Sequence, residues 1–206
     1  MQVLSLLLFI LLLGCQSTSL RTSEGIEESV KKVCLNFEGK TQIDMGEQKI
    51  VGSIESLVES DKWVSAISVP LFGEEQLETL WEGDKVFIKG SMKDRLNAAF
   101  SFYQKKNHLE ESPELLLSFV RHLSLMIKHI KEFDNANCLK DKSALKCGQN
   151  HWSLSDKLHL ERRVNERFKI LIHFSHSDIF YKRMKIQLVE PKRPHFIQDI
   201  LIRSCQ

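Results

Sequence analysis

The strongest constraint on the fold is an alternation of apolar and more polar residues with a period of two. Between residues 50 and 59, one face of an extended segment would carry Ile50, Gly52, Ile54, Ser56 and Val58. Turn-forming residues interrupt the chain at 45–47, 60–62, 71–73 and 82–84 and leave runs of about eight to twelve residues. These runs predict antiparallel strands near residues 33–44, 48–59, 62–70, 75–82 and 85–92.

The middle of the chain predicts one long helix. Ser112 and Pro113 supply an N-cap and a first helical residue, and apolar residues recur at helical spacing as far as Phe133. Residues 26–33 predict a short helix, and residues 96–106 fit either a helix or a strand.

The alternation returns beyond the long helix. We interpret residues 135–150 as a polar loop and expect further strands over 168–174, 179–189 and 196–204. Blocks of strands, then a helix, then strands predict an α+β fold with an antiparallel sheet, because alternating βαβ units would be needed for a parallel one.

The N-terminal segment predicts export. An apolar run from Val3 to Leu13, broken only by Ser5, is shorter than the roughly 20 residues that a transmembrane helix needs and is typical of a signal-peptide core. The run ends in Leu12-Leu13-Gly14-Cys15, which resembles the lipobox of bacterial lipoproteins, where the cysteine is lipidated. No Lys or Arg precedes the apolar core, which departs from the usual pattern; a buried helix that happens to end in cysteine is the alternative.

These features divide the chain into three parts. We expect a signal peptide at residues 1–14, a polar tether at residues 15–25 that begins at lipidated Cys15, and one domain at residues 26–206. Residue 16 is Gln, where Asp would favour retention in the inner membrane of enteric bacteria, so the lipobox resemblance implies a periplasm-facing anchor in the outer membrane.

Four further cysteines are expected to form two disulfides in an oxidising compartment. Of the three pairings, we favour Cys138 with Cys147, which closes a short loop, and Cys34 with Cys205, which would join the first strand to the last. A zinc site at Cys138, Cys147 and His151 is the alternative, but no Cys-x-x-Cys pair supports it.

The charge is distributed unevenly. The net charge is +2, yet the residues from Lys157 onward contain 11 Lys and Arg against 5 Asp and Glu. This basic part is either a set of solvated strand faces or a surface for an acidic partner or anionic lipid headgroups. Nucleic acid is disfavoured as a partner, because the pI of about 8.2 is modest and the basic residues are scattered.

Catalytic, metal and cofactor sites are not expected. The sequence has no Gly-x-Ser-x-Gly, His-Glu-x-x-His, P-loop or dinucleotide-binding motif, so we predict a non-enzymatic protein with an exported hydrolase as a remote alternative. His173 and His176 would point to opposite faces of a strand and its turn, and His122 and His129 lie two helical turns apart, beyond chelation of one ion.

Apolar residues at inward-facing positions leave two interpretations open. They either fill a solid core or line a cavity that holds apolar ligands, as small β-barrels do. The candidate lining residues are Trp63, Ile67, Val69, Trp81, Val86, Ile88, Phe168, Ile172, Met184 and Ile186.

Residues 63–81, followed by Gly83-Asp84-Lys85-Val86, resemble the LolA/LolB-like lipoprotein family. In that family a strand runs into a Pro-Leu-Gly reversal, and this chain has Pro70-Leu71-Phe72-Gly73 there, with Phe72 as an extra residue. The resemblance covers the lipobox, residues 33–92 and the general order of elements, and it is weak in the C-terminal third.

The resemblance implies an unclosed antiparallel β-barrel whose helices form a lid over an apolar cavity for acyl chains. It also implies that Leu71, with Phe72, contacts the outer membrane when cargo arrives from a periplasmic carrier protein. The predicted function is therefore a non-catalytic carrier or receptor that delivers lipoproteins or lipids. The alternative is a structural or assembly lipoprotein with a filled core, which binds a protein partner through its basic C-terminal strands.

Overall fold

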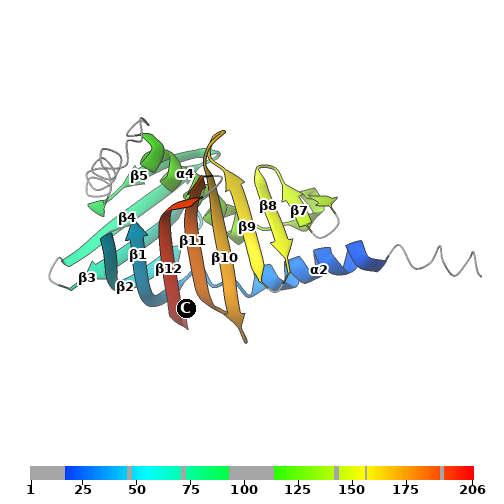
Figure 1. Ribbon diagram of the computed structural model, residues 1–206, viewed down its shortest axis with the longest axis horizontal. Coiled ribbons are helices and arrows are strands. Elements are labelled where there is room, and N and C mark those ends of the chain that lie inside the picture. The colour runs from blue at the N-terminus through cyan, green and yellow to red at the C-terminus, as the bar shows by residue number, and fades with distance from the viewer. Residues whose placement is uncertain are drawn as a thin grey trace, which may run out of the picture.

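The computed structural model describes residues 17–45, 48–70, 73–92, 114–141, 144–155, 157–190 and 193–206. Its main feature is a 12-stranded sheet in the order β5-β4-β3-β2-β1-β12-β11-β10-β9-β8-β7-β6, in which every neighbouring pair is antiparallel. The sheet curls but does not close (Figure 1). The predicted α+β class with a curved antiparallel sheet is therefore correct.

The N-terminal half of the sheet consists of β1 (Phe37–Met45), β2 (Gln48–Val58), β3 (Lys62–Val69), β4 (Gly73–Glu82) and β5 (Lys85–Lys89). The C-terminal half consists of β6 (Leu139–Asp141), β7 (Ala144–Cys147), β8 (Asn150–Leu154), β9 (Leu158–Arg163), β10 (Lys169–Ser177), β11 (Tyr181–Glu190) and β12 (Arg193–Cys205). The five predicted N-terminal strands are all present. The last of them stops at Lys89 because Gly90 takes a left-handed conformation with φ of 105°.

The two halves join where the first strand meets the last. Strand β1 pairs with β12, so that Thr41 lies opposite Ile200. The Cys34–Cys205 disulfide, with Cα atoms 5.9 Å apart, lies at the end of this pair, and Gln206 N donates to Asn36 O at 2.8 Å. The predicted pairing is confirmed, and it links the chain immediately before β1 to the C-terminus of β12.

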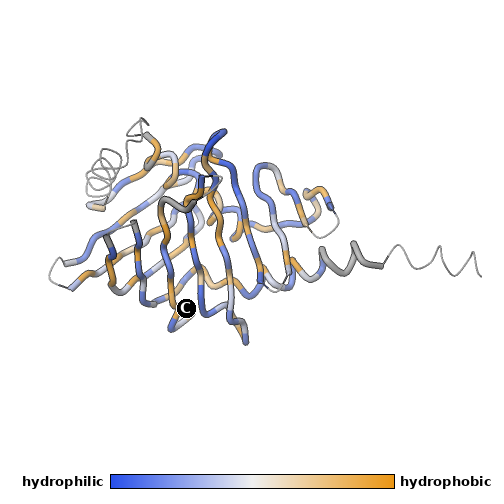
Figure 2. Tube along the Cα trace, viewed as in Figure 1, coloured by the Kyte–Doolittle hydropathy of each residue, from blue (hydrophilic) through white to orange (hydrophobic). Residues whose placement is uncertain are grey.

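The strands have one apolar face, as the alternating colours along them show (Figure 2). On β10, for example, Ile170, Ile172 and Phe174 are at most 1% exposed, whereas the residues between them are half-buried. The buried residues face the concave side of the sheet, because side chains on a strand alternate between the two faces.

Helix α4 (Glu114–Lys131) covers the concave side of the sheet. Its buried stripe follows the helical period and includes Phe119, Leu123, Met126 and Ile130. It packs against β3, β5 and β10 and thus bridges the two halves of the sheet. The predicted long helix is confirmed, although its predicted cap and the predicted element at residues 96–106 lie outside the described residues.

Helix α2 (Ser17–Lys31) packs on the other end of the molecule, against β6 to β9. Ile26 and Val30 of this helix are buried, at 0% and 6% exposed. The helix begins at Ser17, earlier than the predicted residues 26–33, and so extends into the segment predicted to be a tether. Neither α2 nor α4 is both long and apolar enough to cross a membrane, in the part of the chain that is described.

The prediction of a polar loop at residues 135–150 is wrong. They form a 3-10 turn, η1 (Asn135–Asn137), then β6, β7 and the first residue of β8. These short strands form because β7 pairs with β8 and turns Leu145 and Cys147 inward.

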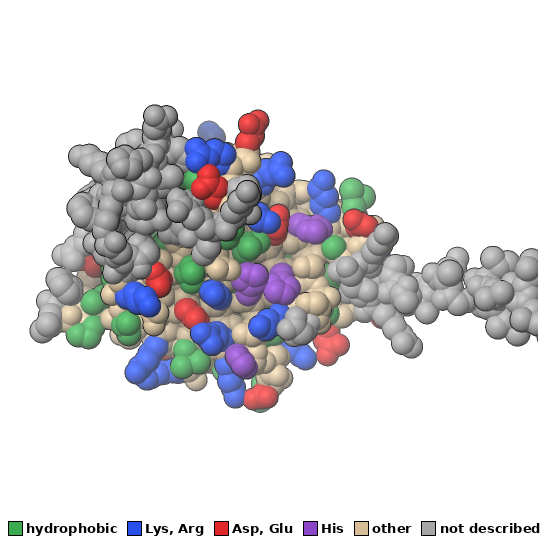
Figure 3. Space-filling view, in the orientation of Figure 1, with side chains coloured by type: hydrophobic (Ala, Val, Ile, Leu, Met, Phe, Trp, Pro, Cys, Tyr) green, Lys and Arg blue, Asp and Glu red, His purple; other side chains and the backbone are tan. Residues whose placement is uncertain are grey.

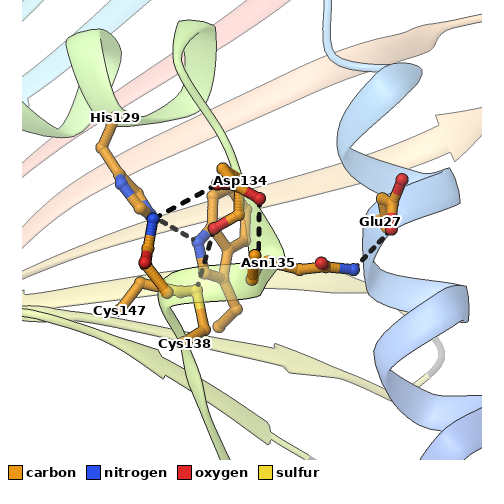
Figure 4. The surroundings of a disulfide bond; sticks show 9 residues. Glu27, His129, Asp134, Asn135, Cys138 and Cys147 are labelled. Carbon is orange, nitrogen blue, oxygen red and sulfur yellow. Dashed lines mark hydrogen bonds between the residues drawn. A yellow bond between two sulfur atoms is a disulfide. The ribbon is translucent and has the colours of Figure 1, made fainter.

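A disulfide and a hydrogen bond hold this region (Figure 4). The Cys138–Cys147 disulfide, the second predicted pair, joins the residue after η1 to the last residue of β7, with Cα atoms 4.4 Å apart. Asn135 donates a side-chain hydrogen bond to Glu27 of α2. The edge of the sheet is thus linked to α2.

Candidate functional site

An apolar pocket of about 60 Å³ lies between α4 and the concave face of the sheet. Phe119, Val120, Leu123 and Ile127 of α4 line one side of it. The opposite side is formed by β1 to β4, β11 and β12. The pocket therefore lies where the two halves of the sheet meet beneath the helix.

Small and polar side chains interrupt the sheet side of this pocket. Ser56, Ser65 and Gln198 are at least 91% buried there. Trp63 Nε1 donates to Ser56 Oγ at 3.1 Å, and Gln198 Nε2 donates to Thr41 Oγ1 at 3.2 Å. These hydrogen bonds give Ser56 and Gln198 partners and hold the Trp63 ring against the pocket.

A buried hydrogen-bond chain anchors α4 to β4 and β3. Trp81 Nε1 donates to Ser124 Oγ at 2.7 Å, Ser124 Oγ donates to Thr79 Oγ1 at 2.7 Å, and Thr79 Oγ1 donates to Trp63 O at 3.4 Å. Ser124 and Thr79 are both 0% exposed. Any outward movement of α4 has to break the bonds of Ser124.

Histidines on α4 face β8 and β9. Trp152 Nε1 donates to His129 Nε2 at 2.9 Å, and Arg162 Nε donates to His122 Nδ1 at 3.1 Å. Burial, and to a lesser extent the charge of Arg162, lowers the pKa of His129 to about 4 and also lowers the pKa of His122. Both rings are therefore neutral at pH 7.

The predicted cavity-lining residues fall into three groups. Trp63, Ile67, Met184 and Ile186 line the pocket. Trp81, Phe168 and Ile172 are buried elsewhere in the core, and Val69, Val86 and Ile88 are partly buried against it. Cys15, Leu71 and Phe72 lie outside the described residues.

Two polar features of the concave side escaped the sequence interpretation. Arg162 follows Leu158 and Leu160 at a spacing of two, so the alternation could have predicted that its side chain points inward. Ser124 lies on the apolar stripe of α4, but the sequence does not show which residue its hydroxyl contacts.

The convex face carries charged residues of both signs and a group of histidines (Figure 3). Arg183 of the basic C-terminal strands pairs with Asp199, and Lys182 pairs with Asp178 at 2.7 Å. His159 and His173 face each other through their Nδ1 atoms, and His173 Nε2 also lies 3.0 Å from Gln187 Oε1. Burial, followed by the charge of His159, lowers the pKa of His173.

The described residues contain no group of three or more His, Cys, Asp or Glu side chains that could hold a metal ion. Cys138 and Cys147 are joined to each other, so the zinc alternative does not apply to them. Neither the protein-family models nor the curated proteins include a match to this chain.

Proposed function

We propose that this protein is a lipid-anchored, non-catalytic carrier or receptor that binds acyl chains beneath α4 and delivers lipoproteins or lipids to the outer membrane. The observation that carries the proposal is the position of the apolar pocket, which has a single helix on one side and a curved sheet on the other. Displacement of that one helix would enlarge the space without breaking a strand pair.

The pocket would have to enlarge on binding. A cavity of about 150 Å³ suffices for a benzene ring, whereas the pocket measures about 60 Å³. An acyl chain would therefore take the place of the apolar stripe of α4, so that α4 acts as the lid. Because each buried methylene contributes about 0.8 kcal/mol, the exchange of helix for acyl chain responds steeply to chain length.

The proposed route of delivery rests on the family resemblance. Lipidated Cys15 would hold the protein at the outer membrane, and Leu71 with Phe72 would contact the same membrane. A periplasmic carrier protein would supply the cargo, and the domain would face the periplasm.

Photocrosslinking tests the proposal. The full chain, purified in an uncharged maltoside detergent, is irradiated with a photoactivatable palmitate, and the labelled peptides are identified by mass spectrometry. We expect labels on α4 and on β1 to β4, β11 and β12, and excess unlabelled palmitate should remove them. Labels confined to the convex face, or no label that palmitate removes, would overturn the proposal.

A pair of variants on α4 provides the matched control. Leu123→Trp places a larger side chain at the pocket, whereas Met126→Trp enlarges a buried residue of the same helix that does not line the pocket. If the indole displaces about two methylenes of the ligand, labelling by subsaturating palmitate should fall roughly ten-fold in Leu123→Trp. Equal losses in both variants would indicate general destabilisation and contradict the assignment.

The second candidate function is a structural or assembly lipoprotein that binds a protein partner through its basic C-terminal strands. The small volume of the pocket favours it, because a nearly filled core needs no ligand. Charge reversal of Lys182, Arg183 and Lys185 together would then abolish copurification of the partner from membranes, whereas Leu71→Glu would leave it unchanged. The opposite pattern would favour the carrier.

A further inference from the structure

A second groove of about 780 Å³, lined mainly by polar and charged residues, lies on the β8–β9 side of α4. It is lined by His122 of α4, by the turn between β7 and β8 with Gln149 and Asn150, and by the chain around Arg163 that ends β9. The groove is distinct from the apolar pocket, because Leu123 lines the pocket whereas the adjacent His122 lines the groove.

Arg162 lies directly behind the lining of this groove. It is 9% exposed, and its three side-chain hydrogen bonds to described residues go to neutral acceptors. Nε donates to His122 Nδ1 at 3.1 Å, Nη1 to Asn150 Oδ1 at 3.2 Å and Nη2 to Gln149 Oε1 at 2.8 Å. No carboxylate pairs with this guanidinium among the described residues, although the charge of Asp84 partly offsets the lowering of its pKa by burial.

Because Arg162 can only donate, it fixes the orientation of its three neighbours. The acceptor atoms of His122, Asn150 and Gln149 face the guanidinium. Their remaining nitrogen atoms, which are His122 Nε2 and the amide nitrogens of Asn150 and Gln149, are therefore donors. Asn150 is 5% exposed, so its amide group is a nearly buried donor at the groove.

The rim of the groove adds positive charge. Lys146 and Arg163 both line it, and neither forms a salt bridge within the described residues. Glu166 is the acidic residue of the lining. Oriented N–H donors backed by a buried guanidinium and flanked by two cations are the recognised chemistry of oxyanion binding.

We propose that the groove between α4, the β7–β8 turn and the end of β9 binds a phosphate group. The donors of His122, Asn150 and Gln149 would contact its oxygens, Lys146 and Arg163 would supply charge at the rim, and Arg162 would act as a positioning residue behind them. Such a group occurs in soluble phosphate compounds and in anionic phospholipid headgroups. The inference does not depend on acyl-chain binding, since the two sites have separate linings.

Calorimetric titration of the full chain in maltoside detergent with inorganic phosphate at pH 7 tests the proposal. We expect saturable binding with a Kd on the order of 1 mM or tighter. Gln149→Glu places a carboxylate beside Arg162 and should weaken phosphate binding at least about ten-fold, because the new charge competes with the ligand. Its thermal stability should be unchanged or higher, which separates the loss of binding from unfolding.

Gln42→Glu is the matched control, because it makes the same charge change at an exposed position of β1 outside the groove. We expect it to bind phosphate as the wild type does, and Lys146→Gln should weaken binding several-fold. Absence of saturable binding by the wild type would overturn the proposal, as would equal affinities of wild type and Gln149→Glu.

A comparison of two probes then distinguishes the sources of the phosphate group. Tighter binding of glycerophosphoglycerol, the water-soluble headgroup of an anionic phospholipid, would support a lipid ligand. Tighter binding of inorganic phosphate would support a soluble phosphate compound. If neither binds, the groove has no phosphate site, whereas the photocrosslinking result for the apolar pocket is unaffected.

Discussion

Trp81 and Ser124 form a buried contact that joins helix α4 to the sheet, with the indole Nε1 donating to the serine hydroxyl at 2.7 Å. The two residues are 43 positions apart in the chain, and Ser124 is completely buried. Because Ser124 also donates to Thr79, its hydroxyl is satisfied on both sides. This bond is a fully buried polar attachment of the helix that covers the apolar pocket.

Loss of the Ser124 hydroxyl should therefore destabilise the protein. Ser124→Ala leaves the Trp81 indole N–H without its acceptor, and a buried unsatisfied donor costs about 1 to 3 kcal/mol. Chemical denaturation should show this decrease in the free energy of unfolding. Ser118→Ala, the same change at a half-buried position of α4, is the control and should change stability by less than about 0.5 kcal/mol. Equal effects of the two substitutions would contradict a specific role for the Trp81 contact.

The two disulfides should contribute unequally to stability. The Cys34–Cys205 bond spans a sequence separation of 171 and the Cys138–Cys147 bond a separation of 9. In the chain-entropy model, the first contributes about 5 kcal/mol and the second about 3 kcal/mol. Denaturation of Cys34→Ala/Cys205→Ala and of Cys138→Ala/Cys147→Ala should give the larger loss for the first pair. The reverse order would mean that native contacts, and not closure of the long loop, determine how much each disulfide stabilises the protein.

Stability should fall as the pH decreases below 6.5. The pKa of His129 is lowered from 6.5 to about 4 in the folded protein by burial and by Arg162, so between these values the unfolded chain binds a proton that the folded chain does not. The stability present above pH 6.5 is lost progressively down to pH 4. After allowance for partial exposure, the loss is on the order of 2 kcal/mol.

Unfolding measured at several pH values checks this expectation. His129→Gln retains an acceptor for Trp152 but does not titrate, so its stability should depend less on pH over the same range. His176→Gln, at an exposed position near the end of β10, should behave as the wild type. A pH dependence that is identical in all three proteins would exclude His129 as the cause.

Gly90 and Gly83 should differ in their tolerance of a side chain. Both have positive φ, at 105° and 61°, but a Cβ atom at Gly90 would lie 2.1 Å from Gln76 O, whereas nothing lies within 4 Å of one at Gly83. Gly83→Ala should cost about 1 kcal/mol through backbone strain alone, and Gly90→Ala should cost more because β5 must move away from β4. Thermal unfolding of both variants compares the two costs directly, and equal melting temperatures would contradict the steric explanation.

Local patterns in the sequence determined the secondary structure well. The alternation at residues 50–59 and the helical spacing up to Phe133 depend only on neighbouring residues, because each element must present an apolar face to a core. The sequence also favoured the pairing of Cys34 with Cys205 among three possibilities, since it placed a cysteine beside the first and the last predicted strand, and the structure confirms it. The error at residues 135–150 arose because β6 and β7 are too short to show periodicity and depend on pairing with β8.

What the sequence alone determined was therefore an antiparallel α+β fold and two disulfides. Only the tertiary structure decided that α4 lies over a pocket of about 60 Å³, that Ser124 meets Trp81, and that Arg162 orients His122, Asn150 and Gln149. Each of these facts joins residues from different elements. The amount of space between packed elements, and the partner of a buried polar group, depend on how the helix and the curved sheet meet, and periodicity along the chain does not encode that geometry.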